Sequence, residues 1–123
     1  MIFKTPILKV QFGLAPKRLQ EISYVFERLS KEFNIEPVVT NVFDGVPGDS
    51  GVHEAQRAID FRDQRGAGFL YTPAQAKSIV DYINATYPRK DDKKTIIHHS
   101  FRGHPFHFHI QIELNPLPAK PKK

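Results

Sequence analysis

Hydrophobic and polar residues alternate without a break along residues 106–114, which read FHFHIQIEL. One parity is apolar throughout: Phe106, Phe108, Ile110, Ile112 and Leu114. The other parity is polar: His107, His109, Gln111 and Glu113. Because side chains at i and i+2 of a strand point to the same side, the pattern predicts a strand whose apolar face packs on the core. The polar face must then meet solvent, a cleft or a metal ion.

Apolar residues at three- and four-residue steps predict two amphipathic helices. The first follows Pro16, ends near Asn34 and Pro37, and turns these residues inward: Leu19, Ile22, Val25, Phe26, Leu29 and Phe33. The second begins at Thr72, where Pro73 and Gln75 complete a capping-box pattern, and ends near residues 86–94. Its inward residues are Ala76, Ile79, Val80 and Ile83.

Shorter apolar runs predict strands. The opening residues 1–13 are compatible with a strand, and residues 36–45 (EPVVTNVFDG) favour a strand that enters a turn at Asp44-Gly45. Residues 58–62 (AIDFR) are strand-like, and residues 95–101 and 106–114 predict an antiparallel hairpin around residues 102–105. This order predicts an α+β domain with two main helices packed on a small antiparallel sheet.

Composition limits what this domain can be. With 123 residues and 40% hydrophobic content, we expect one domain over residues 1–115 and a flexible basic tail over residues 116–123. The absence of cysteine excludes disulfides and thiolate zinc sites, so any metal must bind His, Asp or Glu. No stretch is typical of a signal peptide or a membrane span, so we expect a protein made in the cytoplasm.

The net charge of +5 favours an anionic partner: nucleic acid, a cell-wall polymer or lipid head groups. A nucleic-acid partner is disfavoured, because no element interleaves a Lys/Arg cluster with aromatic residues.

A second polar motif lies upstream of the hairpin. Residues 53–60 (HEAQRAID) place His53 seven residues before Asp60. An Asp in the strand-like run 58–62 is costly to bury unless a cation meets it. His53, Asp60 and one or both histidines of the last strand would supply three or four ligands of the kind that Zn²⁺ accepts.

Other interpretations stay open for each of these residues. Asp60 could pair with Arg57, Arg62 or Arg65, and His53 could cap a turn. The two histidines at 107 and 109 could belong to an ordinary solvated strand face.

Residues 50–60 (SGVHEAQRAID), followed by HFH at 107–109, resemble the zinc peptidases that cut peptidoglycan peptides. This group includes D-alanyl-D-alanine carboxypeptidases, phage L-alanyl-D-glutamate endolysins, lysostaphin-type enzymes and the hedgehog signalling domain. The resemblance spans roughly residues 38–112 and implies a hedgehog-like fold. It also implies that His53, Asp60 and His109 bind Zn²⁺, and that His107 is an unliganded base or transition-state stabiliser.

The implied activity is hydrolysis of peptide bonds in peptidoglycan stem peptides, of carboxypeptidase or endopeptidase type, by a phage or bacterial lytic enzyme acting at the cell wall after release. Three departures leave an alternative, a catalytically inactive zinc-binding member that serves as a binding or virion-structural module. Gln56 replaces a Gly of the motif, Phe106 stands where carboxypeptidases have a catalytic Glu, and residues 38–45 lack a substrate-gripping Arg.

Further residues are candidates for contacts around the metal or with the substrate: Ser50, Arg57, His99 and Gln111. Only one of His98 and His99 can share the polar face of the hairpin, and we favour His99. A ligating histidine usually donates its second ring N–H to another group, for which Glu113, Glu54 and Asp49 are candidates.

Overall fold

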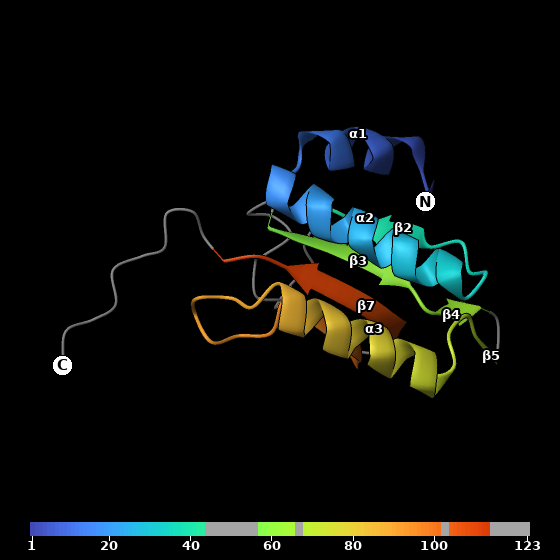
Figure 1. Cartoon of the computed structure of the whole chain (residues 1–123). Coiled ribbons are helices and arrows are strands. Elements are labelled where there is room, and N and C mark those ends of the chain that lie inside the picture. Colours follow the sequence, from blue (N-terminus) through green and yellow to red (C-terminus); the bar gives the residue numbers. More distant parts are fainter. Residues whose placement is uncertain (44–56, 66–67, 102–103, 114–123) are drawn as a thin grey trace.

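The computed structural model describes residues 1–43, 57–65, 68–101 and 104–113. Five strands form one mixed sheet, in the order β1 (Ile2–Phe3), β2 (Val38–Asn41), β3 (Ala58–Arg62), β7 (His104–Gln111) and β6 (Ile96–Phe101) (Figure 1). The predicted α+β class is confirmed. β1 runs parallel to β2, whereas the other neighbouring pairs are antiparallel. The prediction of an antiparallel sheet is therefore wrong at this edge, because helical segments between β1 and β2 return the chain in the same direction.

The predicted hairpin and inner strand are present. β6 and β7 pair antiparallel as predicted, and β3 coincides with the run 58–62. The bounds of the last strand differ from the prediction: β7 begins at His104, inside the predicted turn, and ends at Gln111. A short hairpin of β4 (Gln64–Arg65) and β5 (Gly68–Phe69) was not predicted. The turn expected at residues 44–45 and the tail expected at 116–123 lie outside the described residues.

Both predicted helices form at the expected places, as α2 (Lys17–Glu32) and α3 (Pro73–Thr86). The capping box at the start of α3 is complete: the Gln75 backbone N–H donates to Thr72 Oγ1, and the Thr72 N–H donates to Gln75 Oε1. α2 ends where Asn34 adopts a positive φ of 59°. The Ile35 and Asn34 N–H groups then bond back to the carbonyls of Ser30 and Lys31, which satisfies the last turn.

A third helix, α1 (Pro6–Leu14), occupies most of the opening segment for which a strand was considered. Only Ile2 and Phe3 of this segment form a strand, and Pro6 stands at the first helical position, where its missing N–H costs nothing. Leu8 and Phe12, four residues apart, are buried on the inner side of this helix. The four-residue spacing of Leu8 and Phe12 indicates a helix and not a strand.

Helices α2 and α3 cover one face of the sheet, called here the helix face, and α1 lies beside α2 (Figure 1). Phe26 of α2 stacks on Phe61 of β3, with ring centroids 4.3 Å apart, and meets Phe108 of β7 edge-on at 4.9 Å. Tyr71 joins this cluster, and its hydroxyl bonds to the buried hydroxyl of Ser30 at 2.7 Å. Alternate residues of β3 and β7, including Phe61 and Phe108, therefore face the core, and the residues between them point to the opposite face of the sheet.

No helix within the described segments is long and apolar enough to cross a membrane.

Candidate functional site

The opposite face of the sheet, called here the polar face, brings together ionisable residues from three adjacent strands. Asp60 of β3 lies directly opposite His109 of β7, and His99 of β6 lies directly opposite His107 of β7. Because partners in an antiparallel pair point to the same side, all four side chains share this face. The register thus converges residues separated by up to 49 positions in the chain.

Asp60 is bracketed by two imidazoles. Its Oδ1 lies 2.8 Å from His109 Nδ1, and its Oδ2 lies 4.0 Å from His107 Nε2. The three side chains are 14%, 11% and 16% exposed, in the order Asp60, His109, His107. All three are mostly buried but keep some contact with solvent, so the Asp60 carboxylate is surrounded largely by polar side chains in place of bulk water.

Both ring nitrogens of His109 lie within hydrogen-bond distance of a side chain. A carboxylate only accepts, so the His109 Nδ1 atom carries a proton that it donates to Asp60. The other ring nitrogen, Nε2, lies 3.0 Å from the side-chain amide of Gln111, whose oxygen and nitrogen can exchange places by a flip. Both ring nitrogens therefore have a hydrogen-bond partner, which holds the ring between Asp60 of β3 and Gln111 of β7.

His99 extends the cluster to β6. Its ring centroid lies 4.7 Å from that of His107 and 6.0 Å from that of His109. Burial lowers the pKa of His99, and the neighbouring His107 and His109 lower it further. Burial and these neighbours thus favour the uncharged form of His99.

The remaining predicted residues fall in different places. Arg57 donates from Nη1 to the backbone carbonyl of Ile112 at 3.1 Å, at the end of β3. Glu113, one of the three candidates for the partner of a ligating histidine, lies 3.7 Å from Arg89 Nε. The side chain that meets His109 Nε2 is that of Gln111. The reason is distance along the strand, since Gln111 is two residues from His109 and Glu113 is four.

Four of the predicted residues cannot be placed. His53, which is one of the three expected zinc ligands, and Ser50 lie outside the described residues, as do Asp49 and Glu54.

The spacing of the Asp60 and His109 donor atoms can be compared with the spacing that two ligands of a zinc ion need. Two ligands of one zinc ion lie about 3.3 Å apart, given bonds of about 2.0–2.1 Å and a tetrahedral angle. Asp60 Oδ1 and His109 Nδ1 lie 2.8 Å apart, which is a hydrogen-bond distance and shorter than this separation, so the two side chains would have to move apart to bind one zinc ion. Within the described segments no group of three or more His, Asp or Glu side chains is arranged to hold a metal, so a complete set needs a donor such as His53.

A second Asp–His pair lies on the helix face. Asp63 is buried, accepts the Tyr71 backbone N–H at Oδ1, and meets His98 Nε2 at Oδ2 at 2.5 Å. The His98 ring packs against Phe106 and Phe108. The sequence contains a signal for this pair. Asp63 is two residues after Phe61, so its side chain points to the same apolar face of the sheet, where a carboxylate needs a polar partner.

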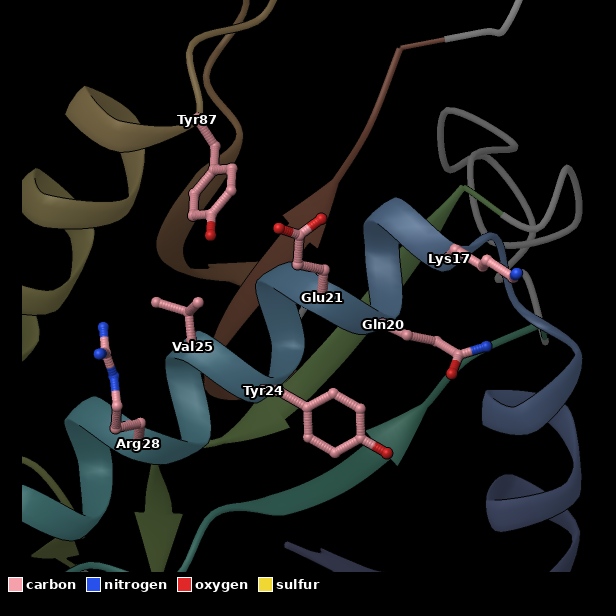
Figure 2. A pocket seen from close by; sticks show the side chains of 7 residues that line it. All are labelled: Lys17, Gln20, Glu21, Tyr24, Val25, Arg28 and Tyr87. Carbon is pink, nitrogen blue, oxygen red and sulfur yellow. The ribbon is translucent and has the colours of Figure 1, made fainter.

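Two hollows lie away from the polar face. One, of about 670 Å³, runs along the outer side of α2. Figure 2 shows Tyr87 reaching toward the Val25 side of this helix, while Lys17 and Tyr24 project from other parts of it. The second, of about 490 Å³, lies beside α3 and β6 and includes Asp63 and His98. Neither is lined by Asp60, His107 or His109, so the candidate site is the cluster on the polar face.

No family model matches the chain, and neither a curated protein nor a solved structure matches it. A function is therefore inferred from the residues of the polar face and from the sequence motifs at residues 53–60 and 107–109.

Proposed function

We propose that this protein is a zinc-dependent peptidase that hydrolyses peptide bonds of peptidoglycan stem peptides. The observation that carries the proposal is the Asp60–His109 pair across β3 and β7, with His107 beside the second carboxylate oxygen. These are the residues that the resemblance to zinc peptidases of the cell wall selects, and they lie 47 to 49 positions apart in the sequence. An accidental match of short motifs would not require them to meet on one face of a sheet.

His53, Asp60 and His109 are the proposed metal ligands. When bound, Zn²⁺ supplies a water of pKa near 7 and polarises a carbonyl group. The Asp60 carboxylate offers two oxygens, and the His109 imidazole is kept in position by the Gln111 amide. A ligand ring that is already held loses less conformational entropy when it binds a metal.

His107 is the proposed proton-transfer residue. It projects from the same face as His109, two residues away, and its Nε2 is directed to within 4.0 Å of Asp60. An imidazole at this position can accept a proton from the attacking water and return it to the leaving amine. The His99 ring lies beside it, with the two ring centroids 4.7 Å apart, and burial favours the uncharged form of His99.

The absence of a Glu three residues before His109 has a structural explanation. Phe106 lies on the helix face, where its ring contacts Phe69 at 5.8 Å and His98 at 5.3 Å. β7 is already extended at this residue, so a carboxylate at position 106 would point away from Asp60. Proton transfer from His107 is therefore the version of the mechanism that this strand permits.

A second candidate function is a zinc-binding module without catalytic activity. The observation that favours it is the same Phe106, because the site then lacks the carboxylate that carboxypeptidases of this group use. Such a module would keep the metal and bind cell-wall peptides without cutting them.

The test combines metal analysis with hydrolysis. Protein purified without chelators is analysed for zinc, then incubated with purified peptidoglycan, and released peptides are identified by mass spectrometry. We expect about one zinc per chain and cleavage by the wild type, with a loss of about 10²- to 10⁴-fold in rate for His107→Ala at unchanged zinc content. His98→Gln, which changes a histidine of the helix face, is the matched control and should retain activity.

The outcomes separate the candidates. Zinc bound to both proteins with equally negligible turnover would favour the non-catalytic module. A wild type that contains no zinc, and gains none on addition of the metal, would exclude both.

A further inference from the structure

Helix α1 carries a continuous apolar stripe that faces away from the rest of the described chain. Ile7, Val10 and Leu14 are 56%, 57% and 69% exposed, whereas Leu8 and Phe12 on the same helix are 4% and 5% exposed. Steps of three and four residues place the exposed three within one narrow arc, opposite the buried pair. Single exposed apolar side chains are ordinary, but three aligned on one helix face indicate a surface that is covered by something else.

The segment of sequence that contains this stripe, residues 1–20, carries charge of one sign. The first 20 residues contain Lys4, Lys9, Lys17 and Arg18 and no acidic residue, so four of the five net positive charges of the chain lie here. All four basic side chains are exposed. Figure 2 shows Lys17 projecting outward at the beginning of α2, next to the end of α1. A partner of this region must therefore be anionic.

The N-terminal ammonium group does not add to this positive field. It is paired with the carboxylates of Glu27 and Glu36, and this pairing raises its pKa against the opposing effect of burial. The positive charge of this segment thus comes from its Lys and Arg side chains, whose apolar stems can lie along an apolar surface while the charged ends stay in a polar environment.

We propose that the outer stripe of α1, formed by Ile7, Val10 and Leu14, docks on the surface of an anionic lipid bilayer. A helix that lies in the interface buries apolar side chains at the boundary of the acyl chains and places Lys and Arg at the head groups. A hydrated anionic polymer would attract the basic residues but would offer the stripe nothing apolar to enter. A second copy of the chain would cover the stripe but would bring two basic regions together.

This inference is independent of the proposed peptidase activity, because α1 supplies none of the residues of the polar face. The docking would be reversible, since three side chains bury little area. It would hold the chain at a membrane without a spanning helix.

The test measures binding of the full chain to vesicles by co-sedimentation, with phosphatidylcholine alone and with phosphatidylcholine containing phosphatidylglycerol. We expect binding only to the anionic vesicles, weakening as salt rises. The double variant Val10→Ser/Leu14→Ser should bind about tenfold or more weakly, because both side chains lose their apolar transfer. Lys4→Gln/Lys9→Gln should also bind more weakly and lose much of the salt dependence.

Matched controls use exposed residues elsewhere. Tyr82→Ser on α3 removes a side chain that is 45% exposed, and Lys93→Gln removes an exposed charge from the loop before β6, so both should bind within about twofold of the wild type. All substitutions are on the surface, and circular dichroism should show unchanged folding.

Equal binding of the wild type and Val10→Ser/Leu14→Ser would overturn the proposal, as would the absence of any binding to anionic vesicles. If the wild type instead dimerises without binding vesicles, and the double variant is monomeric, the stripe is an interface between two copies and the lipid proposal is wrong.

Discussion

Replacing Asp60 by Asn is the most direct perturbation of the candidate metal centre. The amide has the shape of the carboxylate but no charge, so it loses the charge-assisted bond to His109 Nδ1 and offers a weaker metal ligand. Because both side chains are less than one sixth exposed, little of this interaction is screened by solvent. In the metal-free protein we expect a loss of about 1.5–3 kcal/mol in the free energy of unfolding.

Zinc adds a larger and more specific effect. At a free zinc concentration of about 100 times the dissociation constant, binding stabilises the folded wild type by about 2.7 kcal/mol. For a chain of this length that raises Tm by about 8–14 °C. If Asp60→Asn weakens zinc binding about a hundredfold, the same concentration contributes only about 0.4 kcal/mol, a shift of about 1–2 °C.

The assay is thermal unfolding followed by circular dichroism, with chelator and with buffered zinc. Asp63→Asn is the matched control, because it also removes a carboxylate bonded to a histidine, but on the helix face. It should lower Tm in chelator and retain the full zinc-induced increase. A zinc-induced increase that is equal in Asp60→Asn and the wild type would refute the ligand assignment.

Three further predictions concern the fold. Phe26→Ala removes the ring between Phe61 and Phe108 and should cost about 3–5 kcal/mol in urea unfolding; a cost below 1 kcal/mol would contradict the packing. Thr72→Ala should cost about 1 kcal/mol through loss of the α3 capping box, measured in the same assay. Burial raises the pKa of Tyr71 above its ordinary value of 10.0, so its contribution to stability is complete below pH 10 and is lost as pH rises further. Tyr71→Phe should therefore lose about 1 kcal/mol at pH 7 and show a shallower alkaline decline, whereas Tyr82→Phe should keep the wild-type decline.

Much of the helix face could be predicted from the sequence, because its elements have strong local signals. The capping box at Thr72, the Asn34 that ends α2, and the alternation through β7 each specify a local geometry that the structure retains. The parity of β7 also separated residues of the core from residues of the polar face. These features depend on neighbours within about four positions, which is the range that a pattern can report.

The remaining features depend on contacts distant in sequence. The parallel pairing of β1 with β2 involves two residues of each strand, too few to leave a periodic signal. α1 was overlooked because its outer face is as apolar as its inner face, so the helical period is weak.

The meeting of Asp60 with a histidine of the last strand was expected from their residue types as possible metal ligands, and the resemblance selected His109; no periodicity predicts it. Whether His53 completes the set is a prediction that the zinc experiments test.

Strand β7 supplies side chains both to the core and to the polar face, and this limits which changes in its length the protein can tolerate. Its two sets of side chains are interleaved one by one, so an insertion of one residue before His107 would drive both imidazoles toward Phe26 and turn the aromatic rings outward. Folding and chemistry would fail together, and no compensating change at a single position could repair either. Length changes in this strand are therefore tolerable only in steps of two.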